Sequence, residues 1–167
     1  MQVHALLATT DPPARAVAQL RAELDPERSH RYPLHLTLAY APIAQLADVA
    51  LPVGPLAVRL SAVRRWPAPG HGIYLAVEGG PPWLGELREQ LGEPASDPPS
   101  TPHVTLVHPT AAPPEPALRE VADRFAAVWT PGSVGIQSLV VYDDRGRVVA
   151  RRAIADGSRS GDGTAEP

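Results

Sequence analysis

The sequence of 167 residues contains no cysteine. This absence excludes disulfides, thiolate nucleophiles, zinc–thiolate sites and iron–sulfur clusters. No apolar run approaches the length that spans a membrane, and the first residues lack the charged-then-apolar layout of a signal peptide. We therefore expect a cytoplasmic protein with no membrane partner.

The chain also has little net charge, −3 in total. Residues 156–167 hold Asp156, Asp162 and Glu166 against Arg159, so this last stretch accounts for −2 and the rest of the chain for −1. A nearly neutral body argues against a strong nonspecific grip on nucleic acid, which needs a basic surface. A small nucleotide or a single RNA end fits this charge better than a long polyanion, and a local basic pocket for one phosphate is compatible with it.

The sequence does contain short apolar runs, separated by turns rich in its 21 prolines. Alternating apolar residues predict strands over 3–8, 34–40, 56–66, 73–78, 103–108, 134–142 and 147–154. Helical spacing predicts helices over 14–24, 42–50, 83–91 and 117–129. Residues 27–32 are interpreted as a polar loop. We expect a single α+β domain over residues 1–155, followed by a disordered tail at 156–167.

One short phrase occurs twice along the chain. Residues 35–38 read His-Leu-Thr-Leu, and residues 103–106 read His-Val-Thr-Leu. In a strand the histidine and threonine of each phrase share one face, while the apolar residues between and after them point to the core. The order helix, phrase, helix, hairpin is repeated around both copies, with 68 residues between the two histidines. Two such strands can bring two imidazoles into one cleft, and two imidazoles are sufficient for acid–base catalysis without a metal ion.

This pair of phrases resembles the signature of the 2H phosphoesterase superfamily, and in particular its 2′-5′ RNA ligase-like proteins, the bacterial RNA 2′,3′-cyclic phosphodiesterases. The order of elements agrees over roughly residues 2–155. The resemblance implies a bilobal α+β fold, with two pseudo-symmetric antiparallel sheets, helices on the outside and a central cleft. It also implies cleavage of a 2′,3′-cyclic phosphate, on an RNA end or a small nucleotide, without metal or other cofactor. Some members join RNA ends through a 2′-5′ bond in a reversible reaction. We expect a monomer.

The chemistry of such a reaction assigns roles to the repeated residues. Hydrolysis requires that water loses a proton, that the leaving ribose oxygen gains one, and that charge on the phosphoryl oxygens is stabilised. We predict His35 and His103 as the catalytic pair, and Thr37 and Thr105 as phosphate-binding donors. The family's usual assignment implies His103 as base and His35 as acid. The pseudo-symmetric sequence itself does not separate the two roles.

Other residues are candidates for contact with the substrate. Many 2′-5′ RNA ligase-like members carry an arginine five residues after the second histidine, where this chain has His108. His108 could meet a phosphate as a cation at lower pH. Tyr32 and Tyr40 could stack on a base or ribose at the edge of the cleft. Arg28 and Arg31 could approach phosphate, although arginines in a loop are more commonly solvated.

Two other kinds of site stay open. His35, His103 and His108 could form a three-histidine zinc centre, although positions 103 and 108 point to opposite faces of one strand. The other alternative is a binding module that holds a nucleotide or RNA end with little turnover. Three further histidines are expected to be structural: His4, His30 and His71.

Overall fold

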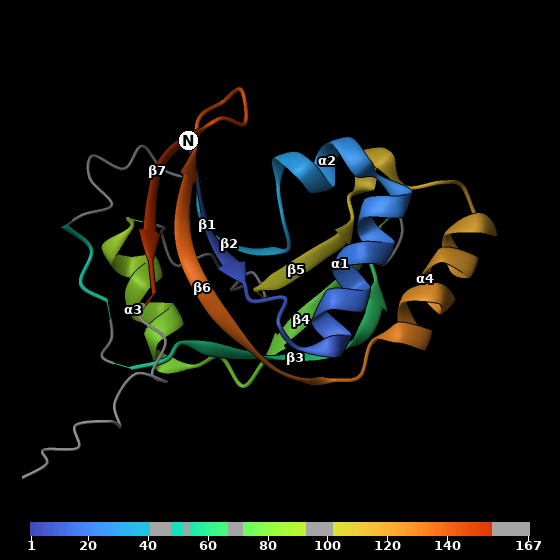
Figure 1. The fold of residues 1–167 in the computed structure, drawn as a ribbon, viewed down its shortest axis with the longest axis horizontal. Helices are drawn as coiled ribbons and strands as arrows, with labels where there is room; N and C mark the ends of the chain where they lie inside the picture. The colour runs from blue at the N-terminus through green and yellow to red at the C-terminus, as the bar shows by residue number, and fades with distance from the viewer. Residues whose placement is uncertain (41–47, 52–53, 67–71, 93–101, 155–167) are drawn as a thin grey trace, which may run out of the picture.

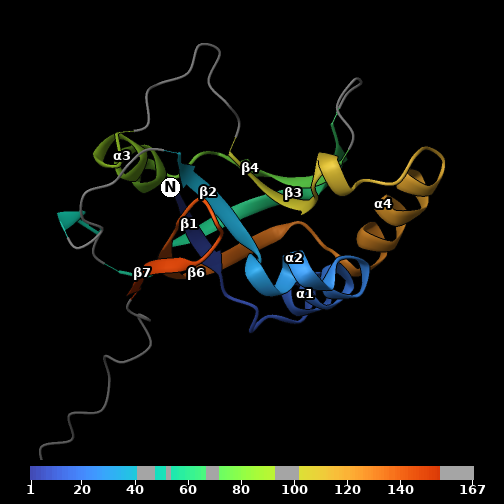
Figure 2. The same cartoon turned by 90° about the horizontal axis from the view of Figure 1, so that it is seen from above.

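The computed structural model describes residues 1–40, 48–51, 54–66, 72–92 and 102–154. Its strands are β1 (Gln2–Leu7), β2 (His35–Ala39), β3 (Ala57–Arg65), β4 (Ile73–Glu78), β5 (His103–Val107), β6 (Gly132–Tyr142) and β7 (Val148–Ala153). Its helices are α1 (Pro12–Leu24), α2 (Pro26–Arg31), α3 (Pro82–Gln90) and α4 (Ala117–Val128), with a short 3-10 turn, η2 (Pro109–Ala111). Helices α1, α2 and α4 gather on one side of the strands and α3 lies on the other (Figures 1 and 2).

All described strands belong to one antiparallel sheet, in the order β1-β2-β5-β4-β3-β6-β7. Because β1 also pairs with β6, six strands close into a barrel-like ring, and β7 extends it along β6. The expected α+β class is confirmed, but the hydrogen bonding makes one closed sheet where two separate sheets were expected. The eleven residues of β6 explain the closure, since its first part pairs with β3 and its later part with β1.

The two strands that carry the repeated phrase are neighbours in this ring. β2 and β5 are joined by the bridge Leu36↔Val104, and both of these residues are fully buried. Because the strands run antiparallel, this register sets His35 beside Thr105 and Thr37 beside His103. The alternation predicted from sequence is therefore confirmed, with the aliphatic residues inside and the histidines and threonines on the opposite face.

One hydrophobic cluster supports both strands from behind. It joins the sheet to residues of three helices, among them Val17 of α1, Leu87 of α3 and Phe125 of α4, each at most 1% exposed. Burial of these side chains stabilises the fold by roughly 1.5–3 kcal/mol each. The polar face of β2 and β5 is thus mounted on a packed core, which limits its movement.

Most of the predicted elements are confirmed within one to two residues, but one is wrong. Residues 27–32, interpreted as a loop, lie mostly in helix α2, because Pro26 occupies its first turn and the Asp25 side chain accepts a hydrogen bond from the Arg28 N–H at 3.1 Å. The predicted tail at 156–167 and most of the predicted helix at 42–50 lie outside the described residues. Within the described chain, no helix is long and apolar enough to cross a membrane.

Candidate active site

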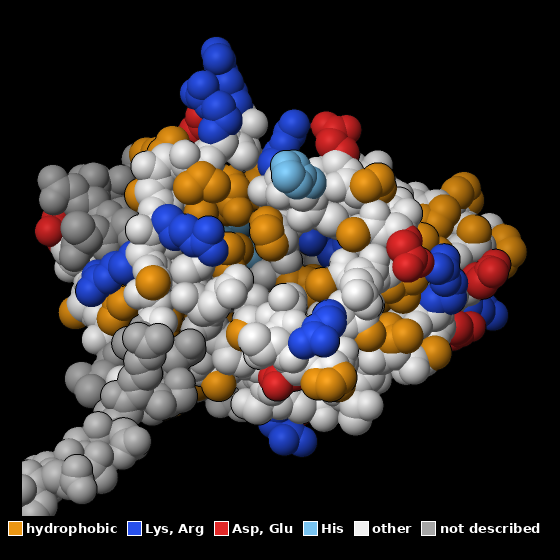
Figure 3. Space-filling view, in the orientation of Figure 1, with side chains coloured by type: hydrophobic (Ala, Val, Ile, Leu, Met, Phe, Trp, Pro, Cys, Tyr) orange, Lys and Arg blue, Asp and Glu red, His pale blue; other side chains and the backbone are white. Residues whose placement is uncertain are grey.

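A cavity of about 370 Å³ opens where β1, β2 and β5 face α1 and α2. The space-filling view shows the hollow on this face of the molecule (Figure 3). Its lining comprises Gln2, His4, Arg21, Arg28, Tyr32, His35, Thr37, Tyr40, Trp66, His103, Thr105, His108 and Pro109. Both repeated phrases therefore contribute to the same cavity, as do all of the predicted site residues except Arg31.

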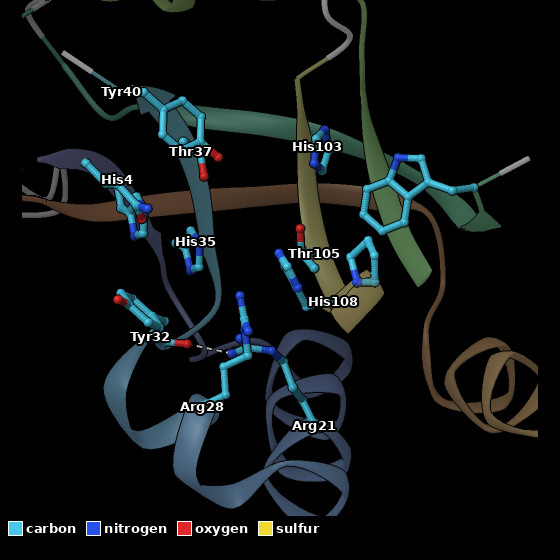
Figure 4. A pocket seen from close by; sticks show the side chains of 13 residues that line it. His4, Arg21, Arg28, Tyr32, His35, Thr37, Tyr40, His103, Thr105 and His108 are labelled. Carbon is cyan, nitrogen blue, oxygen red and sulfur yellow. Dashed lines mark hydrogen bonds between the residues drawn. The ribbon is translucent and has the colours of Figure 1, made fainter. Parts of the chain in front are cut away.

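His35 lies on the β2 wall of this cavity (Figure 4). Its Nδ1–H donates to the carbonyl oxygen of Pro33 at 2.7 Å. Nε2 is then the nitrogen that remains for acid–base chemistry. Burial, the neighbouring His4 and, further away, Arg21 and Arg28 hold the pKa of His35 well below its usual value, and the bond to Pro33 opposes them only in part. His35 is therefore neutral at neutral pH.

His4 of β1 stacks directly on His35. The two ring centroids are 3.9 Å apart and the rings are nearly parallel, at 2°. The β1–β2 register explains this, because His4 is the cross-strand partner of Thr37 and so shares the face that carries His35. His4 is 2% exposed and its Nε2 contacts Gln2 Oε1 at 3.1 Å. Burial lowers the pKa of His4 to about 4, so this ring is neutral as well.

The second histidine has an aromatic neighbour in the same register. Tyr74 of β4 is the cross-strand partner of Thr105, as His4 is of Thr37. The Tyr74 ring approaches His103 at 5.7 Å, and Trp66 meets the same imidazole edge-on at 5.2 Å. Each candidate catalytic imidazole is therefore held against a ring from the adjacent strand. His4 was expected to be structural; it is buried, and it also stacks on His35 within the site.

Replacing His4 tests whether the stacked ring orients His35. An aromatic stack contributes about 0.5–1.5 kcal/mol beyond the area that it buries, so we expect His4→Ala to lower kcat by about threefold to tenfold with little change in KM. His4→Phe keeps a flat ring and should retain most of kcat. Steady-state kinetics and thermal unfolding of both variants would separate the roles. Equal loss of kcat in both variants, matched by equal loss of stability, would show a purely structural role.

The two threonine hydroxyls lie on either side of the cleft. Thr37 is on the β2 wall and Thr105 on the β5 wall, each near the histidine of the opposite strand (Figure 4). Neither hydroxyl makes a hydrogen bond to any residue within the described ranges. Both are therefore free to donate to the oxygens of a ligand that enters between the strands.

His108 enters the cavity because β5 ends at Val107 and the chain turns there into η2. The expectation that positions 103 and 108 point to opposite faces is therefore wrong. The Nδ1 of His108 accepts from the Thr110 N–H at 3.2 Å and lies 2.8 Å from its hydroxyl. Burial and the charge of Arg28 both lower the pKa of His108. The ring thus presents a neutral Nε2–H donor, whereas the sequence suggested a cation.

Two arginines stand at one end of the cleft, on the side of α1 and α2 (Figure 4). Arg21 comes from α1 and Arg28 from α2. Sequence reasoning weighed Arg28 and missed Arg21. A signal for Arg21 was present, because it follows Val17 by four residues and so interrupts the buried stripe of its helix with a charge. No carboxylate belongs to the described lining, so this end of the cleft is cationic.

Three of the remaining predicted contacts can also be placed. Tyr32 lines the cavity and packs its ring against Tyr142 at 5.0 Å. Tyr40 lies at the opposite end and is 67% exposed, which suits a flat ligand at the rim. Arg31 does not line the cavity, and its side chain reaches Glu27 at 3.5 Å along α2. The turn of α2 therefore brings Arg28, rather than Arg31, to the site.

A zinc centre built from His35, His103 and His108 is not assembled in this cleft. Among the residues placed by the structure, no three histidine, aspartate or glutamate side chains cluster closely enough to hold a metal ion. The donor set is better suited to an anion, since it consists of hydroxyls, imidazoles and guanidinium groups.

Comparison with protein families now agrees with the geometry. The sequence profile of the 2′-5′ RNA ligase superfamily matches residues 9–143 of the chain. The chain belongs to this superfamily, the 2H phosphoesterases to which the two His-x-Thr phrases pointed. Membership supports a phosphoesterase-type enzyme.

Solved structures with a similar fold are remote in sequence. A phosphoesterase crystal structure shares 17% identity, with a TM-score of 0.49, over 93% of this chain and 97% of that one. E. coli LigT complexed with ATP shares 17% identity, with a TM-score of 0.46, over 93% and 97%. E. coli LigT complexed with NADP+ shares 16%, with a TM-score of 0.44, over 92% and 93%. No curated protein gives a significant match.

Proposed function

We propose that the protein is a phosphodiesterase that hydrolyses 2′,3′-cyclic phosphates by two-histidine acid–base catalysis. The observation that carries the proposal is the convergence of two imidazoles and two unengaged hydroxyls, from two adjacent strands, on one cavity that is cationic at one end. Hydrolysis of a cyclic phosphodiester requires a base, an acid and hydrogen-bond donors to the phosphoryl oxygens, and these four groups can supply all three. The family includes enzymes of this type, and the cavity volume of about 370 Å³ suits a nucleotide-sized ligand.

The proposed reaction runs as an in-line displacement at phosphorus. His103 takes a proton from water as the water oxygen bonds to phosphorus. The bond from phosphorus to one ribose oxygen breaks, and His35 gives its proton to that oxygen. The Thr37 and Thr105 hydroxyls donate to the non-bridging oxygens, whose negative charge persists through the reaction. Replacing water by a ribose hydroxyl in the same arrangement gives the 2′-5′ ligation that some members catalyse.

The acid role places a condition on His35. The ring is neutral in the empty cleft, so it must gain a proton when the substrate binds. A bound phosphodiester supplies this change, because its negative charge offsets the charges of Arg21 and Arg28 that lower the pKa of His35. We therefore expect His35 to become protonated when the substrate binds.

The direct test is an assay of the purified protein, in EDTA, on nucleoside 2′,3′-cyclic phosphates and on a short RNA that ends in one. We expect ring opening to a single monoester, and the position of that phosphate identifies the leaving oxygen. Activity that disappears with EDTA and returns with a metal ion would contradict the mechanism. Binding without any product would support the alternative, a nucleotide or RNA-end binding module.

Removing one threonine hydroxyl should weaken catalysis without disturbing the strand. A hydrogen bond to a charged group contributes about 1.5–3 kcal/mol, so we expect Thr37→Val or Thr105→Val to lower kcat/KM by about tenfold to hundredfold. Valine keeps the β-branched shape that suits β2 and β5. Thr10→Val, an exposed position outside the cavity, is the matched control. Unchanged kinetics in both strand variants would rule out the phosphate-binding role.

A further inference from the structure

The unusual feature of the cleft is a buried guanidinium with no acidic partner. Arg21 is 3% exposed, and its Nη1 donates to the carbonyl oxygen of Tyr32 at 2.6 Å. Its side chain forms no ion pair with any carboxylate in the described chain. Burial and the nearby Arg28 lower the pKa of Arg21 to about 10, and Asp25 offsets this only in part. Buried charges in proteins are normally paired, so the surroundings of Arg21 favour an anionic ligand.

Arg28 reinforces this indication from the adjacent helix. Its guanidinium makes no hydrogen bond or ion pair with any residue that the structure places. Its charge acts on Arg21, and it also lowers the pKa of both His35 and His108. Like charges held together in a cavity without carboxylates destabilise the empty protein. An anion bound beside both guanidinium groups would offset this repulsion.

The cleft is also polarised along its length. The two arginines approach from α1 and α2 at one end, while Thr37, Tyr40 and His103 stand toward the other (Figure 4). A phosphate that reacts with both imidazoles must lie between β2 and β5, within reach of the threonine hydroxyls. The arginine end therefore extends beyond this position, toward α1 and α2.

We propose that Arg21 and Arg28 form a second anion subsite, which binds a phosphoryl group on the 5′ oxygen of the nucleoside whose cyclic phosphate reacts. The inference rests on the proposed function and narrows its substrate. A free nucleoside 2′,3′-cyclic phosphate leaves this subsite empty. A 5′-phosphorylated nucleotide fills it with a monoester, and an RNA end fills it with the diester that leads to the preceding nucleotide.

The test compares three substrates that differ only at the 5′ oxygen: adenosine 2′,3′-cyclic phosphate, its 5′-phosphate, and the dinucleotide ApA with a terminal 2′,3′-cyclic phosphate. A charged hydrogen-bonding contact of this kind should favour a 5′-phosphorylated substrate by about tenfold to hundredfold in kcat/KM. Arg28→Gln should lower kcat/KM for the 5′-phosphorylated substrates more than for adenosine 2′,3′-cyclic phosphate, and so abolish this preference. A preference for the dinucleotide over the 5′-monophosphate would identify an RNA end as the source of the phosphoryl group.

Arg31→Gln is a matched control, because Arg31 lies on the same short helix but outside the cavity. It should retain the preference. Two outcomes overturn the subsite: equal kcat/KM of the native protein for substrates with and without the 5′-phosphoryl group, or equal losses for both in Arg28→Gln. The second outcome would assign Arg28 to the reacting phosphate.

A binding measurement tests the subsite independently of catalysis. By calorimetry, adenosine 3′,5′-bisphosphate should bind the native protein about tenfold or more tightly than adenosine 3′-monophosphate, and Arg28→Gln should remove the difference. If no cyclic phosphate is cleaved but this difference is seen, the proposed function fails and the subsite stands. If cleavage occurs but the two ligands bind equally, the subsite fails alone.

Discussion

Replacing His35 or His103 with asparagine should lower kcat for cyclic phosphate hydrolysis by about 10²- to 10⁴-fold, the usual contribution of a positioned general acid or base. Asparagine retains hydrogen-bonding capacity but cannot exchange a proton near neutral pH. At position 35 it can also still donate to the Pro33 carbonyl, which the native ring engages through Nδ1. The loss is therefore expected in proton transfer more than in the orientation of β2.

The effects of the two substitutions on kcat should not be multiplicative. Both imidazoles act in one displacement, so the double variant should be about as slow as the slower single variant. His30→Asn is the matched control, since His30 is exposed on α2 and does not line the catalytic cavity. Thermal unfolding and binding of adenosine 3′-monophosphate would show that each variant is folded with an intact cleft. Full activity in either single variant would exclude the two-histidine mechanism.

The part of this site that sequence could predict is the part encoded by strand alternation. His35 and Thr37, and their counterparts in the second phrase, share a face because successive strand residues alternate. The aliphatic residues between them indicated which face of each strand is buried, and therefore which face carries the histidine and threonine. The repetition of the phrase then placed both strands in one cleft, and the register between β2 and β5 agrees.

The remaining site residues depend on contacts between segments that no local pattern encodes. Arg21 reaches the cleft because α1 and α2 pack together over the barrel, and Arg28 does so because a loop-like stretch forms a short helix instead. His4 stacks on His35 only through the register of β1 against β2, which includes a bulge after Val3. Closure of the sheet likewise depends on the length of β6, whose pairing with β1 brings together residues more than a hundred positions apart.

Position 108, where the resemblance leads us to expect an arginine, holds a histidine in this chain. His108 is committed to Thr110 through Nδ1 and so offers one neutral donor rather than a bidentate cation. Positive charge is supplied instead from α1 and α2. Since Arg21 and Arg28 repel each other in the empty cleft, Arg28→Gln should leave the melting temperature unchanged or raise it. A polar substitution that weakens binding while it stabilises the fold is the expected signature of a site organised for its ligand.

Acidification should destabilise the protein well above the pH at which its carboxylates protonate. Burial lowers the pKa of His4 from 6.5 to about 4 and holds that of His35 well below 6.5. The unfolded chain therefore binds more protons than the folded one below about pH 6.5, so stability is full above that pH and is lost as pH falls. From about pH 7 to about pH 5, His4 alone should remove roughly 2 kcal/mol from the free energy of unfolding, and His35 acts in the same direction.

Denaturant unfolding at a series of pH values measures this loss of unfolding free energy, and the variant His4→Phe isolates the part of it that is due to His4. The phenyl ring keeps the stack on His35 but cannot bind a proton, so the decline between about pH 7 and about pH 5 should shrink by roughly 2 kcal/mol. His30→Gln, which removes an exposed histidine instead, is the control and should follow the native curve. An identical decline in native protein and His4→Phe would show that His4 contributes nothing to the loss of stability. It would contradict a lowered pKa of His4 in the folded protein, and with it the neutral imidazole stacked on His35.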